Sequence, residues 1–207
     1  MISRSFRNDI IFQRALKSAF EFLLNRSIGR YTIAEILAYY TDRLLRKSSE
    51  KRREEEIEDI LGVVIELFEN LEDKDFFADI YKTLLAKRLL GNTSASEDAE
   101  KSIITKMKLC CGAQYTSKLE GIVNDLHLAS DIQGVFHSNS PGLPIDFSVQ
   151  VLTLSYWPSY KNYYCVSPQV MNDCTVIFNK YYENSTTHRT LKSVSYTHLT
   201  LPTNREV

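Results

Sequence analysis

The feature that most constrains how this chain can fold is the spacing of its apolar residues, which recur every three or four positions along most of the first 140 residues. This spacing gathers apolar side chains on one face of a helix and predicts an amphipathic helix wherever it persists. Gly and Pro, which destabilise helix interiors, number only 7 and 5 among 207 residues. The sequence therefore predicts a mainly α protein, large enough for one sizeable domain or two small ones.

The spacing divides this region into a series of helices. A first helix over residues 9–25 would bury a stripe that includes Phe12, Leu16 and Phe20. Further helices are predicted over residues 32–45, 57–71, 74–90 and 97–111, then over 116–126 and about 130–136. The expected N-caps include Thr32, Ser96 and Thr116.

The period changes after the prolines at 141 and 144. Residues 145–158 alternate between apolar and polar, a pattern typical of a half-buried strand. Its apolar face comprises Ile145, Phe147, Val149 and Val151. Ser167 and Pro168 then predict the start of a last helix that continues to about residue 181. We therefore expect a helix bundle over residues 1–140 and the start of an α/β domain over residues 141–193.

Composition argues against several functional classes. A net charge of −1 provides no overall attraction to nucleic acid or to anionic membranes. No stretch approaches the roughly 20 apolar residues of a membrane-spanning helix, and the N-terminal segment is too charged for a secretory signal. Four cysteines, two of them adjacent, do not make a disulfide framework. We expect a cytoplasmic and nuclear protein with free thiols, and neither nucleic acid nor a membrane as partner.

No motif argues for a catalytic or metal centre. Cys110 and Cys111 are neighbours, so they point about 100° apart on a helix. The four histidines form no helical pair that would suit a metal, and there is no Gly-rich phosphate loop. We expect no metal, no cofactor and no enzymatic activity. The alternative is a cysteine nucleophile, at Cys111 or Cys174, that transfers an acyl group.

Charge is distributed unevenly along the chain. Residues 50–79 carry twelve acids and four bases, a net charge of −8, whereas residues 82–118 carry seven bases and three acids, a net charge of +4. Solvated helix faces explain this pattern, and so does a basic surface that speeds association with an acidic partner.

Two stretches carry a family resemblance. FFADIYKTLLAKRLL at 76–90 and SASEDAEKSIITKMKLCCGAQYTSKLEG at 94–121 resemble the most recognisable part of the cullin family, the scaffolds of cullin–RING ubiquitin ligases. IDFSVQVLTLSYWP at 145–158 resembles the strand that follows in that family. The resemblance extends over about residues 8–192, and the sequence of these motifs favours the cullin of SCF-type ligases. It implies the four-helix-bundle region of a cullin C-terminal domain, followed by the truncated start of its α/β domain.

The resemblance also implies partners and a function. In the family, the α/β sheet accepts a strand from the RING-box protein, and a basic surface of the bundle faces the ubiquitin-conjugating enzyme. Other cullin regulators are implied as further partners. The implied function is a non-catalytic scaffold that positions the RING-box protein and the conjugating enzyme relative to substrate, for ubiquitin-dependent degradation.

Residues at matching positions would meet these partners. The residues that accept the strand would be Ile145, Phe147, Val149, Val151, Arg189 and Leu191. The basic surface would comprise Lys82, Lys87 and Arg88, with Lys101 and Lys106 as neighbours.

Parts of the family pattern are not found in this sequence. They are the N-terminal stalk of helical repeats, the rest of the α/β domain, and the winged helix with the lysine that receives a ubiquitin-like modifier. Agreement ends after Leu191, and residues 194–207 look like translated sequencing-adaptor sequence; the alternative is a divergent strand built on Tyr196, Leu199 and Leu201. The motifs leave two other functions open. One is a cysteine-dependent transferase of ubiquitin or of another acyl group, and the other is a helical module that binds partners outside the ubiquitin system.

Overall fold

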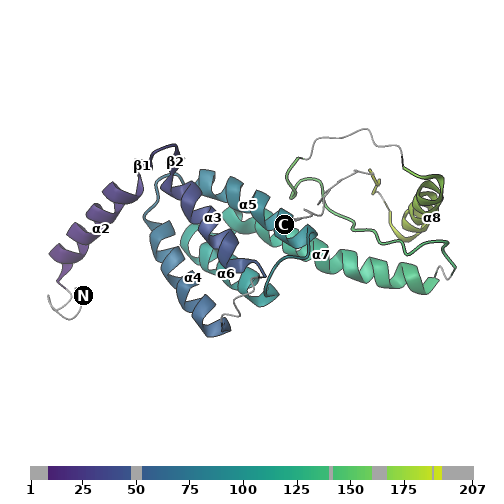
Figure 1. Cartoon of the computed structure of the whole chain (residues 1–207), viewed down its shortest axis with the longest axis horizontal. Coiled ribbons are helices and arrows are strands. Elements are labelled where there is room, and N and C mark those ends of the chain that lie inside the picture. Colours follow the sequence, from purple (N-terminus) through teal and green to yellow (C-terminus); the bar gives the residue numbers. More distant parts are fainter. Residues whose placement is uncertain (1–8, 48–52, 140–141, 160–166, 188, 193–207) are drawn as a thin grey trace, which may run out of the picture. The chain divides into compact units, whose positions relative to one another are not determined.

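A computed structural model describes residues 9–47, 53–139, 142–159, 167–187 and 189–192. These residues form seven helices and one two-stranded antiparallel ribbon (Figure 1). In chain order the elements are α2 (Ile10–Leu24), β1 (Ser27–Ile28), β2 (Tyr31–Thr32), α3 (Ile33–Leu45), α4 (Glu54–Glu69), α5 (Lys74–Leu90), α6 (Glu97–Cys111), α7 (Ala113–Asn139) and α8 (Gln169–Ser185). The predicted mainly α class is confirmed. None of the described helices is long and apolar enough to cross a bilayer.

The chain divides into two compact units. The first comprises Met1–Asn124 with Thr153–Pro158, and the second comprises Asp125–Leu152 with Ser159–Val207. Helix α7 contributes its N-terminal part to the first unit and its C-terminal part to the second. The predicted adaptor-derived tail, residues 194–207, lies outside the described residues.

Polar side chains begin several helices where the sequence predicts. The hydroxyl of Thr32 accepts a hydrogen bond from the Glu35 amide at 3.2 Å, and the hydroxyl of Ser96 accepts one from the Ala99 amide at 3.4 Å. These bonds satisfy amides that the first helical turn leaves without an intrahelical partner. The N-caps predicted at Thr32 and Ser96 are therefore confirmed.

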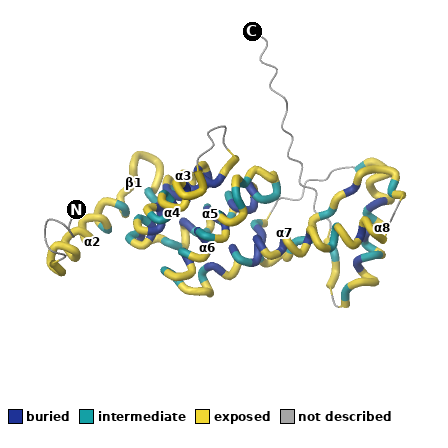
Figure 2. Tube along the Cα trace, turned by 90° about the horizontal axis from the view of Figure 1, so that it is seen from below, coloured by how far each residue is buried: buried dark blue, intermediate teal, exposed yellow. Residues whose placement is uncertain are grey.

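Helices α3 to α6 form the core of the first unit. α3 packs on α4 and α5, and α4 packs on α6, with the buried residues on the facing surfaces (Figure 2). Aromatic rings join α4 to α5, since the ring centroids of Phe68 and Phe77 lie 4.9 Å apart. Within α5, the ring of Phe77 stacks on that of Tyr81 with centroids 5.8 Å apart. Other large apolar side chains that are fully buried in this unit are Leu45, Leu61, Leu85, Ile103, Met107 and Ile122.

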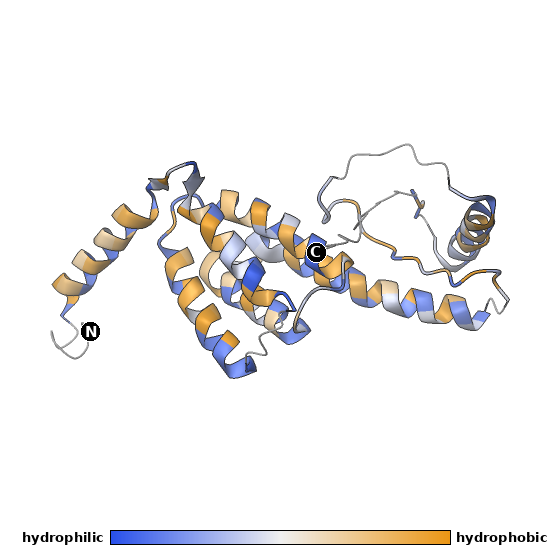
Figure 3. Cartoon of the chain, in the orientation of Figure 1, coloured by the Kyte–Doolittle hydropathy of each residue, from blue (hydrophilic) through white to orange (hydrophobic). Residues whose placement is uncertain are grey.

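Helix α2 differs from its prediction in burial. The helix forms as expected and carries apolar residues along its length (Figure 3), but none of its residues is buried. Phe12, Leu16 and Phe20 expose 44%, 45% and 38% of their surface. The expectation that this stripe is buried is wrong here, because periodicity reports amphipathicity and says nothing of which surface covers the apolar face.

Helix α7 is continuous where the sequence predicts two helices. Thr116 lies within its first turns, where the buried hydroxyl donates to Glu120 Oε1 at 2.8 Å instead of capping a helix start. The break predicted before residue 130 does not occur. Both predictions are wrong because polar residues are tolerated inside a helix when their side chains bond within it. Helix α8 begins one residue later than predicted, with Pro168 at the N-cap.

The strand predicted over residues 145–158 is not formed in the described residues, whose only strands are β1 and β2. The alternation survives in part, because Phe147 is buried while Val149 and Val151 are half-buried. Ile145 is exposed, contrary to the prediction. A strand requires a hydrogen-bonded neighbour strand, and the described residues supply none. The predicted α/β character is therefore not seen in residues 142–192 where they are described.

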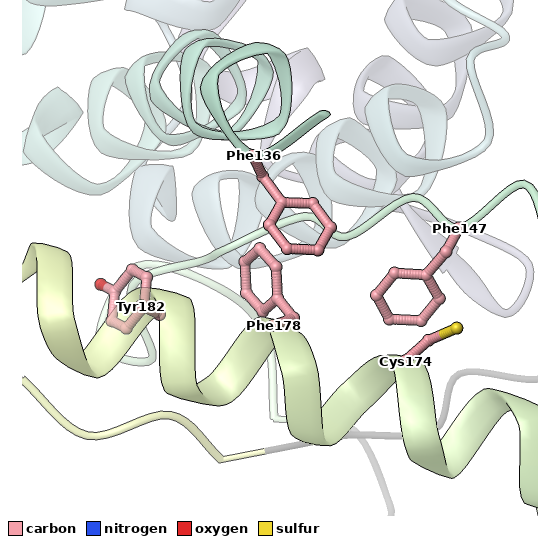
Figure 4. Packing of buried hydrophobic residues seen from close by; sticks show 5 residues of the cluster. All are labelled: Phe136, Phe147, Cys174, Phe178 and Tyr182. Carbon is pink, nitrogen blue, oxygen red and sulfur yellow. The ribbon is translucent and has the colours of Figure 1, made fainter. Parts of the chain in front are cut away.

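The second unit has a small apolar core of its own. Phe136 from α7 packs with Phe147 and with side chains from α8, as Figure 4 shows. The rings of Phe136 and Phe178 meet edge to face at 5.0 Å, a favourable geometry for aromatic pairs. The buried members of this core are Phe136, Phe147, Cys174, Phe178 and Tyr182.

Gly121 marks a close approach between α7 and residues 153–158. A Cβ atom at this position would lie 2.5 Å from Cδ2 of the Tyr156 ring, too close for non-bonded carbons. Gly121→Ala is therefore expected to destabilise the protein by about 1–3 kcal/mol through overpacking. Gly62→Ala in α4 is the control, because a Cβ atom there meets nothing within 4 Å; it should stabilise by about 0.5–1 kcal/mol. Urea unfolding measures both, and equal effects would contradict the close approach.

Candidate functional site

The five predicted basic residues separate into four lysines at the surface and one buried arginine. Lys87 and Lys101 are exposed, and Lys82 and Lys106 are half-buried. Arg88 has an exposed fraction of 0%. The prediction that Arg88 belongs to the basic surface is therefore wrong.

The guanidinium of Arg88 pairs with carboxylates from two other helices. Its Nε and Nη2 donate to Oε1 and Oε2 of Glu100 at 2.9 and 2.8 Å, a two-point pairing that matches the planar fork of arginine. Its Nη1 donates to Oδ1 of Asp42 at 2.5 Å. The side chains of Arg88 and Glu100 are fully buried, and that of Asp42 is 7% exposed. This Arg88 network thus joins α5 to both α6 and α3.

Other side chains occupy the remaining positions around the two carboxylates. Arg46 donates to Oδ2 of Asp42 at 2.7 and 2.8 Å. The hydroxyls of Ser94 and Tyr81 donate to Glu100 at 2.8 and 3.3 Å. No buried side-chain nitrogen or oxygen in the described residues lacks a hydrogen-bond partner. A fully satisfied buried network of this kind holds its members in one geometry.

Arg88 and Tyr81 do not exchange protons near neutral pH. Burial alone would lower the pKa of Arg88, but hydrogen bonds to Glu100 and Asp42 outweigh it and raise the pKa above its ordinary value. Burial, followed by the negative charge of Glu100, raises the pKa of Tyr81. Arg88 is therefore cationic and Tyr81 is a neutral donor, so the arrangement suits structural positioning and not acid–base catalysis.

The sequence holds a signal for this network that the charge count misses. Arg88 follows Tyr81 and Leu85 at helical spacing, so it continues the buried stripe of α5. Glu100 likewise precedes Met107 on the buried stripe of α6. Asp42 lies between Ala38 and Leu45 on the buried stripe of α3, so all three charged residues of the network are in phase with apolar stripes. Opposite charges at such positions on separate helices indicate a buried ion pair, because buried charges are found paired.

Most of the surface lysines pair with acids. Lys82 lies 3.4 Å from Asp79, and Lys101 lies 2.5 Å from Glu97. These pairs lie within single helices and contribute little to stability because at least one partner of each is exposed to solvent.

Lys106 forms a pair between helices, and Lys87 forms none. Lys106 hydrogen-bonds to Glu58 of α4, which lowers the pKa of Glu58. Lys87 takes part in none of the ion pairs between described residues. Among the predicted basic residues, Lys87 is therefore the exposed cation best placed to attract an acidic partner.

The predicted strand-accepting residues fall into two groups. The residues that join the apolar core of the second unit are Phe147, Val149, Val151 and Leu191. The exposed residues are Ile145 and Arg189. The structure thus brings residue 191 to the face formed by the residues near 149, although they are far apart in sequence.

The described cysteines are poor nucleophiles at neutral pH. The thiol of Cys110 lies 3.0 Å from Oε1 of Glu69, and burial together with this carboxylate raises its pKa to about 11. Burial also raises the pKa of Cys111, and Cys174 is buried in the second core. Because the thiolate is the reactive form, these environments oppose a cysteine transferase. The described residues contain no group of three or more potential ligands placed to hold a metal ion.

Comparisons with known proteins agree on one family. A family model described as Cullin alpha solenoid domain matches residues 1–133. Cullin-1 of Oryza sativa subsp. japonica is 41% identical over 198 residues, which cover 92% of this chain and 26% of that protein. Cullin-4A of Mus musculus is 38% identical over 182 residues, 86% of this chain and 24% of that protein. The chain spans about a quarter of the length of these relatives.

Removing the charge of Arg88 tests the network. Arg88→Met leaves Glu100 and Asp42 buried without their cation, and is expected to destabilise the protein by about 3–5 kcal/mol. Lys87→Met is the matched control, one residue away and exposed, and should change stability by less than about 0.5 kcal/mol. Urea unfolding followed by circular dichroism measures both. A small effect of Arg88→Met, similar to that of the control, would contradict the network.

Replacing Glu69 tests the environment of the Cys110 thiol. Glu69→Gln should lower the pKa of Cys110 from about 11, because the thiolate would no longer face a carboxylate. Glu66→Gln, exposed one turn earlier on α4, is the control and should leave the pKa unchanged. The rate of iodoacetamide alkylation against pH, measured by peptide mass spectrometry in a Cys111→Ser background, reports this pKa. An unshifted profile in Glu69→Gln would contradict the assigned contact.

Proposed function

Because this chain belongs to the cullin family, we propose that it forms part of a non-catalytic scaffold of a ubiquitin ligase. The observation that supports this proposal is the Arg88 network, in which the buried charged side chains of Asp42, Arg88 and Glu100 join three helices of the first unit. A scaffold needs partners held at fixed separations, since positioning raises the effective concentration of one reactant near another. A bundle whose helices are joined by buried ion pairs meets that need.

The proposal extends to particular partners. A RING-box protein would add a strand beside Phe147, Val149 and Val151, with main-chain hydrogen bonds supplying affinity. A ubiquitin-conjugating enzyme with an acidic segment would approach the basic surface at Lys87 and Lys82. The Cullin-1 names among the relatives support an SCF-type ligase, acting in ubiquitin-dependent degradation in the cytoplasm and nucleus. Other cullin regulators would act on the same scaffold.

The described thiols weigh against the transferase alternative. A thioester-forming cysteine needs a lowered pKa and an accessible sulfur. The pKa values of Cys110 and Cys111 are raised, and Cys174 is buried. A scaffold that leaves the bond chemistry to its partners fits these environments better.

Charge reversal at Lys87 tests the basic surface. Lys87→Glu should slow association with an acidic-tailed ubiquitin-conjugating enzyme roughly two- to fivefold at low ionic strength, because steering by an exposed charge acts mainly on the association rate. Stopped-flow fluorescence measures the rate, and the difference should shrink at physiological salt, where the screening length is about 8 Å.

The matched control for this test is Lys180→Glu, the same charge change at an exposed lysine on α8. It should leave the association rate within the error of the parent chain. Equal slowing by both variants would mean that net charge alone matters, and an unchanged rate in Lys87→Glu would count against the proposed surface.

A further inference from the structure

The segment around Phe147 and Val149 is held at one edge by a single side chain. Nε2 of Gln133, on α7, donates to the Phe147 carbonyl at 3.0 Å, and Oε1 of Gln133 accepts from the Val149 amide at 2.8 Å. A neighbouring strand would use one N–H and one C=O in the same way to pair with these two backbone groups. The Gln133 amide therefore supplies the donor and the acceptor that the N–H and C=O of one residue in a parallel neighbour strand would supply.

The orientation of this amide is fixed by its partners. A carbonyl can only accept and an amide N–H can only donate, so Nε2 must face Phe147 and Oε1 must face Val149. Nε2 of Gln133 also hydrogen-bonds to Nε2 of His137, one helical turn later. Rotating the amide by 180° would place Oε1 against the Phe147 carbonyl and Nε2 against the Val149 amide, so both backbone bonds would be lost.

The opposite edge of the same segment is open. In an extended chain, successive residues direct their N–H and C=O groups to alternate edges, so Asp146, Ser148 and Gln150 point away from the edge that Gln133 occupies. All three residues are exposed, and within the described residues their backbone groups have no hydrogen-bond partner. Meanwhile Phe147 and Val149 anchor one face in the apolar core. The segment is thus held by one face and one edge, with its second edge free.

We infer that Gln133 is a positioning residue that holds Phe147–Val149 extended, so that a strand of the RING-box protein pairs along the opposite edge. This inference rests on the proposed function, which supplies the partner, and it adds the residue that prepares the site. A segment that is already extended does not have to be ordered when the partner binds, so the affinity is higher. Strand addition requires such an unpaired edge.

Backbone hydrogen exchange in the full 207-residue chain tests the role of Gln133. In Gln133→Leu, which keeps the shape but not the hydrogen bonds, the Val149 amide should exchange at least about tenfold faster than in the parent. Gln133→Glu keeps an acceptor and should retain Val149 protection. Gln150→Leu, on the open edge, is the control and should not change it. Equal Val149 exchange in the parent and Gln133→Leu, or equal loss in Gln133→Glu, would overturn the assignment.

A second measurement concerns the open edge. With excess RING-box protein, the Ser148 and Gln150 amides of the parent should become protected, and Gln133→Leu should weaken binding about tenfold. Unchanged protection of the Phe178 amide shows that the second core remains folded in the variant. If these edge amides stay unprotected in the parent, the proposed RING-box site fails, while Val149 exchange still decides the role of Gln133. If Gln133→Leu binds the RING-box protein as tightly as the parent does, the positioning role is overturned.

Discussion

The pairing of Arg88 with Glu100 and Asp42 is the interaction on which the first unit depends. Each of the three residues comes from a different helix, and their side chains are almost entirely removed from water. A slip of one helical turn, about 5.4 Å, would separate the charges and leave them buried without partners. Apolar side chains tolerate repacking far better than this. The apolar core therefore makes the helices associate, whereas the Arg88 network determines where along their lengths they meet.

The charge asymmetry of the sequence is only partly expressed at the surface of the fold. An acidic segment over residues 50–79 and a basic one over 82–118 suggest two opposed surfaces. In the fold, part of this charge is paired: Lys106 bonds to Glu58 between α6 and α4, and Arg88 is buried among carboxylates. Fewer of these bases are therefore exposed and unpaired in the described residues than the sequence indicates, and Lys87 on α5 is one that remains so.

Local structure was predictable from this sequence, whereas tertiary partners were largely not. The helices and the caps at Thr32 and Ser96 follow from short-range spacing and side-chain chemistry. The burial of α2 and the strand near Phe147 failed because each depends on a neighbour that a local pattern does not specify. The prediction that Arg88 is at the surface is wrong because residue type and segment charge do not report which face of a helix a residue occupies. The position of Arg88 on the buried stripe of α5, in phase with Tyr81 and Leu85, does carry that information.

Both units use a polar side chain to fix a geometry that apolar packing leaves undetermined. In the first unit the Arg88 guanidinium joins three helices. In the second unit the amide of Gln133, a residue of α7, holds the extended segment at Phe147 and Val149. Neither group is poised to donate or abstract a proton in a reaction, and each is satisfied by partners that admit one arrangement. These groups therefore position parts of the chain and take no part in a reaction. A protein that brings other proteins together depends on the positions of its surfaces. Buried polar groups that fix the register of helices and the edge of an extended segment meet that requirement of a scaffold.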